Sequence, residues 1–264
     1  MGISLVLKGR VALVTGGSRG IGAEIVRVFV EAGARVAFSY RQARERAEAL
    51  VSECGGPERC LTIEQDLSTP AEGRALVAAA VKAFGRLDVL VVNHGVWPAE
   101  DAPIAEMAEE QWRRTLAVNL DSVFGLAQAA VGQMERQNGR VEQPDAKGHI
   151  VLISSTAGQR GEAYHADYAV TKGALISLTK SLSSELAPRG IRVNCVAPGW
   201  ARTEMSAPAL ADPELGPKIA AGIPVGRPGT TREIAGPVLF LCTPMAGFIS
   251  GEVLNVNGGA VLVG

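Results

Sequence analysis

The chain has 264 residues, 47% of them hydrophobic, which suits one globular domain with a full core. Its 26 basic and 27 acidic residues leave a formal net charge of -1, so no basic surface for nucleic acid or an anionic membrane is expected. The four cysteines form no C-x-x-C pair and have no histidine at ligand spacing, so we expect neither a metal site nor disulfides. No apolar run is long enough to span a bilayer and no signal peptide is recognisable, which predicts a cytoplasmic protein.

Short apolar runs alternate along the chain with longer amphipathic segments. Runs rich in β-branched residues predict strands at 10–15, 35–40, 60–65, 87–92, 148–154, 191–197 and 252–257. Helical periodicity predicts helices near 21–32, 42–53, 70–84, 109–136, 166–187 and 231–242. Strands that are apolar on both faces and alternate with helices indicate a parallel sheet covered on both sides. We therefore expect an α/β fold, a doubly wound Rossmann-like parallel sheet of about seven strands, in a single domain over residues 1–264.

Residues 198–230 interrupt this alternation because they are rich in Pro, Ala and Gly and are too long for a plain connection. Long irregular segments of this kind often cover a site. We predict a mobile substrate lid at 200–222.

The first predicted strand leads into the sequence VTGGSRGIG, with glycines at positions 16, 20 and 22. Glycines let the backbone turn tightly and approach a phosphate, and the N-terminus of the following helix supplies N–H donors. This predicts a pyrophosphate site. The spacing differs from the common G-x-G-x-x-G fingerprint, so a plain glycine-rich turn remains the alternative.

The second predicted strand ends in FSYRQ, and this ending bears on the choice of cofactor. An acidic residue at this place binds the ribose hydroxyls of NAD, whereas a nearby arginine accommodates the 2′-phosphate of NADP. Here Tyr40 stands where the acid is expected, Arg41 follows it, and Arg19 lies in the glycine loop. We predict NADP(H) as cofactor. The alternative is that Arg41, Arg44 and Arg46 are only the solvated face of a helix.

Tyr168 and Lys172 lie four residues apart in the predicted helix 166–187, so both side chains lie on one face. A cation near a phenol lowers its pKa, which would suit Tyr168 to general acid catalysis on a carbonyl oxygen. Ser154 and Ser155 end the preceding strand, at the edge of the sheet where ligands bind in open α/β folds. A Y-x-x-x-K pattern alone also occurs by chance.

Together these residues resemble the short-chain dehydrogenase/reductase superfamily across essentially the whole chain. The matching segments are TGGSRGIG (15–22), QDL (65–67), VNHG (92–95), AVNL (117–120), Ser155 with Tyr168 and Lys172, PGWART (198–203) and ISGEVLNVNGG (249–259).

The resemblance implies a catalytic role for four residues. Tyr168 is the proton donor, and Ser155, which lies thirteen residues before it and is chosen over Ser154, holds and polarises the carbonyl group. Lys172 lowers the pKa of Tyr168 and binds the nicotinamide ribose. Asn119, in the middle of a helix, holds a water molecule behind Lys172.

The resemblance also implies cofactor contacts. Asp66 accepts from the adenine amino group, Leu67 packs near the ring, Asn93 and Gly95 form a floor under the adenosine, and Thr203 contacts the carboxamide. The whole expected cofactor set is Gly16, Ser18, Arg19, Gly20, Ile21, Gly22, Tyr40, Arg41, Asp66, Leu67, Asn93, Gly95, Tyr168, Lys172, Pro198, Gly199 and Thr203.

The chain departs from the family pattern N-N-A-G, because Val92 replaces the first Asn and His94 replaces the Ala. For His94 we expect a structural role, with its ring bonded to nearby backbone, rather than a catalytic one. Trp97 and Trp200 follow predicted strands at the ligand-binding edge, and they are either walls of the substrate pocket or core residues.

By resemblance, the chain is expected to be an NADP(H)-dependent ketoreductase similar to 3-oxoacyl-[acyl-carrier-protein] reductases. Arg189 falls where those reductases place a basic contact for the carrier protein. A small-ketone, sugar or polyol dehydrogenase is the alternative enzyme, and a non-catalytic dinucleotide sensor is disfavoured by the intact catalytic set. The resemblance implies a homotetramer, and burial between subunits would also explain the apolar ending GGAVLVG at 258–264.

Overall fold

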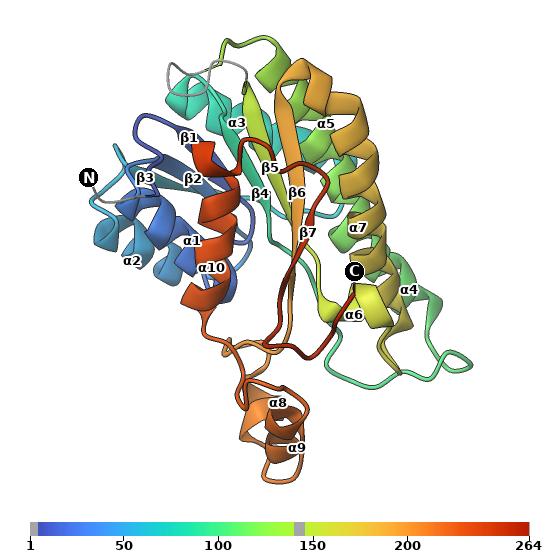
Figure 1. Cartoon of the computed structure of the whole chain (residues 1–264). Coiled ribbons are helices and arrows are strands. Elements are labelled where there is room, and N and C mark those ends of the chain that lie inside the picture. Colours follow the sequence, from blue (N-terminus) through green and yellow to red (C-terminus); the bar gives the residue numbers. More distant parts are fainter. Residues whose placement is uncertain (1–4, 140–145, 264) are drawn as a thin grey trace.

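Seven strands form one parallel sheet through the centre of the molecule (Figure 1). The computed structural model describes residues 5–139 and 146–263, so Gly264 at the end of the predicted apolar tail lies outside it. The strands are β1 (Val11–Val14), β2 (Arg35–Tyr40), β3 (Cys60–Glu64), β4 (Val89–Val92), β5 (Gly148–Ile153), β6 (Ile191–Pro198) and β7 (Val253–Val256). Their order is β3-β2-β1-β4-β5-β6-β7, and every neighbouring pair is parallel. Each predicted strand is present within one or two residues of its predicted ends.

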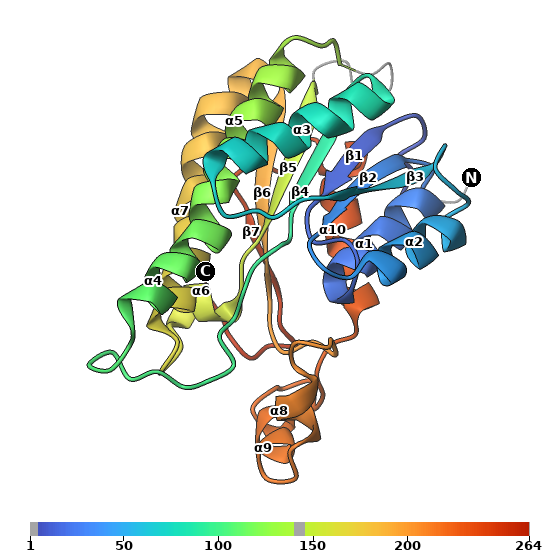
Figure 2. The same cartoon turned by 180° about the vertical axis from the view of Figure 1, so that it is seen from behind.

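Two layers of helices cover the sheet, as the doubly wound prediction requires. One layer contains α1 (Gly20–Glu31), α2 (Arg44–Glu53) and α10 (Thr231–Leu241), and the other contains α3 (Pro70–Phe84), α5 (Ser122–Glu135) and α7 (Ala166–Leu186) (Figures 1 and 2). Alternate strand residues face opposite layers: Ala12 and Val14 belong to the core under α1, whereas Leu13 belongs to the core under α3. The strands read as continuous apolar runs because both faces are buried.

The predicted helix 109–136 is three segments, which corrects the sequence prediction. The first is α4 (Glu109–Leu116), the second is a π turn (Ala117–Asp121), and the third is α5. In the π turn the backbone N–H of Ser122 bonds to the carbonyl of Ala117, five residues back. Such turns inside α-helices are frequent at functional sites, and this one contains Asn119.

Three short helices were not predicted. They are α6 (Thr156–Arg160), α8 (Ala207–Ala211) and α9 (Leu215–Ala221). Helices α8 and α9 occupy the predicted lid, and they pack on each other while projecting from the body of the molecule (Figure 1). At five to seven residues they are too short to show a clear helical period in the sequence.

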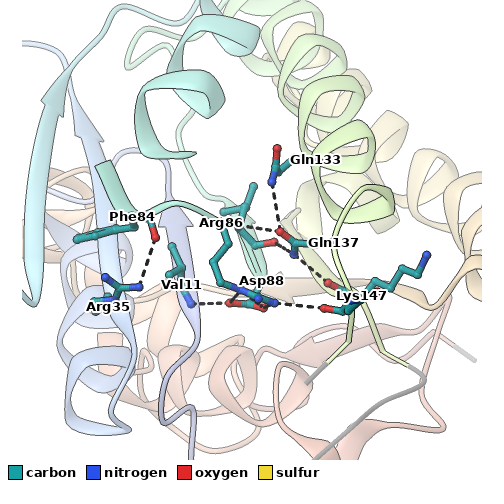
Figure 3. Close-up of polar contacts among 10 residues, drawn as sticks. Val11, Arg35, Phe84, Arg86, Asp88, Gln133, Gln137 and Lys147 are labelled. Carbon is teal, nitrogen blue, oxygen red and sulfur yellow. Dashed lines mark hydrogen bonds and ion pairs between the residues drawn. The ribbon is translucent and has the colours of Figure 1, made fainter. Parts of the chain in front are cut away.

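A polar cluster ties together the ends of the sheet that lie away from the predicted site (Figure 3). Asp88 is fully buried. Its carboxylate accepts a hydrogen bond from the backbone N–H of Val11 at 2.9 Å and forms an ion pair with Arg86 at 2.6 Å. Gln137, just after the end of α5, donates to the carbonyl groups of Leu87 and, at 3.2 Å, Lys147. These contacts join the amino ends of β1, β4 and β5, and leave the carboxyl ends as the open edge.

Among the helices described, none is both long and apolar enough to cross a membrane.

Candidate active site

A cavity of about 390 Å³ opens at the carboxyl edge of the sheet, where β1 and β4 lead to opposite helical layers. Ligands of open α/β sheets bind at this kind of position, and the volume lies in the range of small-molecule sites. Every predicted catalytic and cofactor residue except Asn119 lines this cavity. Asn119 is only 2% exposed and lies behind the wall.

The glycine loop between β1 and α1 has the shape that a phosphate-binding loop needs. Gly16 and Gly20 have φ angles of 65° and 54°, in the left-handed region that favours glycine. A side chain on Gly22 would lie 2.2 Å from the carbonyl oxygen of Gly16. Gly17 was not among the predicted residues, but a Cβ atom there would lie 2.6 Å from that of Phe38. Side chains at Gly17 and Gly22 would therefore clash, the φ angles of Gly16 and Gly20 favour glycine, and the loop leads directly into the N-terminus of α1.

The capping position of α1 leaves that N-terminus available to a ligand. Arg19 is the N-cap residue, and its side chain makes no capping hydrogen bond. The first backbone N–H groups of a helix need an external partner, and an anionic phosphate is well suited to them.

Two arginines at the cavity differ from their neighbours. Arg19 and Arg41 line it, are exposed, and have no ion-pair partner among the described residues. Arg44, by contrast, pairs with Glu64, and Arg46 pairs with Glu204 at 3.0 Å. The surface-charge interpretation therefore fits Arg44 and Arg46, whereas Arg19 and Arg41 keep uncompensated charges beside the cavity.

Tyr40, the third residue predicted near the cofactor phosphate, is 5% exposed. Its hydroxyl group donates to Glu64 at 3.0 Å. Tyr40 contributes to the cavity wall with its hydroxyl group already bonded.

Asn93 joins the end of β4 to the glycine loop. Its side-chain amide donates to the carbonyl oxygens of Thr15 at 3.1 Å and Gly16 at 3.2 Å. Asp66 is exposed at the far end of the cavity and accepts the backbone N–H of Leu67 at 2.9 Å. The predicted adenosine residues thus form one continuous part of the wall.

Ser155, rather than Ser154, is the serine beside Tyr168. Ser155 is the N-cap of α6 and accepts the backbone N–H of Ala157 at 3.1 Å, and its hydroxyl group is near enough to Tyr168 to lower the pKa of that phenol. The hydroxyl group of Ser154 is buried and donates to the carbonyl oxygen of Lys172 at 2.7 Å. The ammonium group of Lys172 donates to the carbonyl oxygen of Ile153 at 2.8 Å and lies 5.6 Å from the centre of the Tyr168 ring.

Burial controls the protonation of both groups and corrects one prediction. The pKa of Tyr168 is raised to about 12, chiefly by burial, and the hydrogen bond from Ser155 only partly offsets this effect. The pKa of Lys172 is lowered to about 8 by burial. The prediction that Lys172 brings the pKa of Tyr168 below its ordinary value is therefore wrong for the protein without a bound ligand. Desolvation outweighs the attraction because the ammonium group lies over the ring and is bonded to Ile153.

Asn119 connects the π turn to both neighbouring segments. Its carbonyl oxygen accepts the N–H of Val96 at 2.8 Å, and its amide group donates to the carbonyl of Val96 at 2.9 Å and to Thr171 at 3.2 Å. A Cβ atom on Gly95 would lie 3.2 Å from the Asn119 oxygen and 3.5 Å from the Lys172 nitrogen, so Gly95 allows the two groups to approach. The side chain of Asn119 thus has protein partners, and its role toward water stays a prediction.

The other end of the cavity contains residues that the sequence analysis did not assign. Trp97 and Trp200 line it, as the pocket-wall interpretation expected. Glu162 and Arg160 line it as well and were missed. Burial raises the pKa of Glu162, and the nearby charge of His165 opposes this shift. The sequence did contain a signal for Arg160 and Glu162, because both lie in the segment between Ser155 and Tyr168, which starts and ends at the site.

No group of three or more His, Cys, Asp or Glu side chains in the described ranges is arranged to hold a metal ion.

Comparison with known proteins places the chain in a family. A family model described as enoyl-(acyl carrier protein) reductase matches residues 16–261. The 3-oxoacyl-[acyl-carrier-protein] reductase of Vibrio cholerae is 37% identical over 258 residues, which are 97% of this chain and 99% of that protein.

Two solved structures are similar over nearly their whole length. A short-chain dehydrogenase/reductase of Brucella melitensis, titled a glucose/ribitol dehydrogenase, has a TM-score of 0.88 and 35% identity, covering 99% of this chain and 100% of that one. A blue fluorescent protein from a metagenomic library, solved in complex with NADPH, has a TM-score of 0.85 and 37% identity, covering 97% of this chain and 99% of that one. With the cavity, its glycine loop and the Ser155–Tyr168–Lys172 cluster, these matches show that the chain belongs to the short-chain dehydrogenase/reductase superfamily of NAD(P)-using oxidoreductases.

Proposed function

We propose that this chain is an NADPH-dependent ketoreductase that interconverts a ketone and a secondary alcohol. The observation that carries the proposal is that Ser155, Tyr168 and Lys172 line one cavity with the glycine loop, with the Lys172 nitrogen 5.6 Å from the centre of the Tyr168 ring. A binding protein or redox sensor has no need of a buried, protonated phenol beside a second hydroxyl donor.

In this mechanism the two hydroxyl groups hold the carbonyl oxygen of the substrate. NADPH, when bound in the cavity, would be the source of the hydride for the carbonyl carbon. Tyr168 gives its proton to the oxygen. Its high pKa keeps it protonated at neutral pH, and the transfer is still favourable because an alkoxide is a much stronger base than a phenolate. Ser155 stabilises the developing negative charge through its hydrogen bond. Lys172, charged below its pKa of about 8, stabilises the tyrosinate left behind and binds the nicotinamide ribose.

The glycine loop and the two unpaired arginines fit the phosphates of NADP(H). A pyrophosphate would lie at the N-terminus of α1, where the loop glycines leave space. Arg19 and Arg41 would hold the 2′-phosphate, since both line the adenosine end of the cavity without another ion-pair partner among the described residues. The NADPH complex of a 37% identical structure supports the same choice.

A 3-oxoacyl group on a carrier protein is the first candidate substrate, because the Vibrio cholerae relative is named for it. A small polar ketone is the second candidate, and two observations favour it. Arg189, expected to contact an acidic carrier, is already paired with Glu135 at 2.8 Å and lies 3.9 Å from Glu185. The carboxyl group of Glu162 in the cavity wall is also better suited to hydroxyl groups of a substrate than to an acyl chain.

The decisive experiment measures NADPH and NADH consumption with four ketones. These are 3-oxobutanoyl on an acyl carrier protein, its N-acetylcysteamine thioester, acetoin and dihydroxyacetone. Turnover of the carrier-bound and the free thioester, with a lower KM for the former, supports the first candidate. Turnover of only acetoin or dihydroxyacetone supports the second. No NADPH oxidation with any of them, while NADPH binds, would contradict the ketoreductase proposal.

A further inference from the structure

His94 stands in the loop after β4, between the two segments that form the site. Its ring lines the cavity and is half-buried. On one side it packs on the glycine loop, since a Cβ atom on Gly16 would lie 3.0 Å from the Cα of His94. On the other side it contacts the π turn that carries Asn119. The proposed reaction assigns no role to this residue.

Both ring nitrogens of His94 have close partners. Nδ1 lies 2.7 Å from the hydroxyl oxygen of Thr15, at the end of β1. Nε2 lies 2.8 Å from the hydroxyl oxygen of Ser122 and 3.1 Å from the carbonyl oxygen of Val118.

The protons of this cluster can be assigned by counting donors and acceptors. The Thr15 oxygen accepts the backbone N–H groups of Asn93 at 2.9 Å and His94 at 3.2 Å, so its own proton is free to be donated. Nδ1 at 2.7 Å is a closer acceptor for that proton than the carbonyl oxygen of Val91 at 3.4 Å. The ring proton then lies on Nε2 and is donated toward Val118 and Ser122. A neutral ring satisfies every partner in this arrangement.

The protonation state agrees with this assignment. Burial and the positive charge of Lys172 lower the pKa of His94 to about 4. The ring is therefore neutral at physiological pH, and it keeps one donor and one acceptor nitrogen.

The hydrogen bonds of His94 continue through the π turn to the catalytic helix. Val118 directly precedes Asn119 in the π turn. Its carbonyl oxygen accepts hydrogen bonds from the ring of His94 and, at 2.8 Å, from the hydroxyl group of Ser122. Asn119 bonds to Thr171 of α7 at 3.2 Å, and Thr171 donates to the carbonyl oxygen of Tyr168 at 2.8 Å. One chain of contacts thus runs from the glycine loop through His94 to the helix that holds Tyr168 and Lys172.

We propose that His94 is a positioning residue, which fixes the π turn relative to the glycine loop and so holds Asn119, Tyr168 and Lys172 in register with the nicotinamide. This role rests on the proposed ketoreductase function. An alanine at this position, as in the usual family pattern, has no ring atoms to make these three contacts. The role differs from catalysis because His94 acts through Val118 and Asn119.

The test compares His94→Leu, which keeps the bulk but removes both nitrogens, with His94→Gln, which keeps an N–H donor and an acceptor. His149→Leu is the matched control, because it makes the same substitution at a buried histidine that lies in β5 at the amino edge of the sheet. Misplacement of reacting groups by about 1 Å can cost about 100-fold in rate, so we expect kcat of His94→Leu to fall about 10- to 100-fold. The Kd for NADPH should change less than about threefold, because the substitution leaves the groups that hold the cofactor in the ground state in place. His94→Gln should recover part of the lost kcat.

Hydrogen exchange of the cofactor-free variants gives a second readout that does not depend on turnover. Exchange at residues 117–123 should increase in His94→Leu and stay unchanged in His149→Leu, even if both variants lose a similar amount of thermal stability. Unchanged kcat and unchanged exchange in His94→Leu would overturn the positioning role. If the unmodified protein reduces no ketone, the proposed function fails, and the exchange measurement still decides whether His94 holds the π turn.

Discussion

Burial acts in opposite senses on the two titratable groups of the proposed site. It disfavours the charged form in each case, so it raises the pKa of Tyr168 to about 12 and lowers that of Lys172 to about 8. At neutral pH Tyr168 therefore carries its proton, while Lys172 is still mostly charged. This combination suits reduction of a carbonyl group, which consumes a proton.

The hydroxyl group of Tyr168 is expected to matter for turnover but little for cofactor binding. Tyr168→Phe removes only the hydroxyl group, which is the proposed proton donor. General acid catalysis contributes typically about 10²–10⁴-fold, so kcat for ketone reduction should fall at least about 100-fold. The Kd for NADPH, measured by fluorescence titration, should remain nearly unchanged. A variant that retains most of its activity would contradict the assignment of Tyr168 as the acid.

The pH profile is expected to follow Lys172. A lysine is charged below its pKa, so its charge is lost as the pH rises through about 8. If this charge binds the ribose and stabilises tyrosinate, kcat/KM for NADPH should be constant at neutral pH and should decline above about pH 8, because this quantity reports groups of the free enzyme. Lys172→Arg, which stays charged, should move the decline to higher pH. A decline at the same pH in both proteins would assign it to another group.

Cofactor preference is expected to depend on Arg41. Hydrogen bonds to charged groups contribute about 1.5–3 kcal/mol, and about 1.4 kcal/mol is a factor of ten, so one arginine should favour NADPH about tenfold or more before salt screening. Arg41→Ala should lower kcat/KM for NADPH and leave that for NADH nearly unchanged. Arg44→Ala is the matched control, because Arg44 is already paired with Glu64. Equal preference for both cofactors in the unmodified protein would mean that Arg19 and Arg41 are only surface charges.

Helices α8 and α9 are attached to the body more loosely than the other helices. They pack mainly on each other, and a second cavity, lined by Arg27 of α1 and Leu210 of α8, separates them from the body. Thr203 and Met205, which precede them, line the active-site cavity. A segment with few contacts to the core and a side chain at the site can close over a ligand.

We therefore expect residues 200–222 to be a lid that closes on NADPH binding. Hydrogen exchange in this segment should slow when NADPH is added, whereas exchange in residues 77–84, the second half of α3, which do not line the cavity, should not change. Equal protection of residues 200–222 with and without the cofactor would contradict the lid.

Large apolar side chains remain exposed on two separate parts of the molecule. Phe124 on α5 is 57% exposed, while Phe248 and Leu262, before and after the edge strand β7 in the chain, are 106% and 87% exposed. Exposed apolar groups and an unpaired strand edge are commonly covered by another subunit. Two different self-complementary surfaces combine into a tetramer with two-fold axes.

A homotetramer is accordingly expected in sedimentation experiments. Phe248→Asp should remove one of the two interfaces and yield a dimer, and Phe124→Asp should remove the other. Phe124→Leu, which keeps an apolar side chain, should remain tetrameric. A stable monomer of the unmodified protein at working concentration would contradict this prediction.

Local sequence patterns determined the strands, the position of the cavity and the long helices apart from 109–136, which the π turn divides. Runs such as 35–40 predict β2 because both faces of a central parallel strand are apolar, and the order of elements then places the site at the carboxyl edge. Tyr168 and Lys172 were found because helical spacing is a property of the chain itself. Gly22 was found by its place in the loop before a helix.

Other features depend on groups that only the tertiary structure brings together. The bonds of His94 join Thr15 to Val118 and Ser122, which lie 79, 24 and 28 positions away in the chain, so no local pattern contains them. Arg41 and Arg44 look alike in the sequence, and Glu64 on the neighbouring strand neutralises only Arg44. The pKa of Tyr168 could not be predicted from its spacing to Lys172. The spacing shows that a cation is near, but it does not show how far the phenol is removed from solvent. The sequence by itself thus determined which groups are present and in what order, and the packed structure decided their charge and partners, because desolvation and long-range hydrogen bonds exist only after folding.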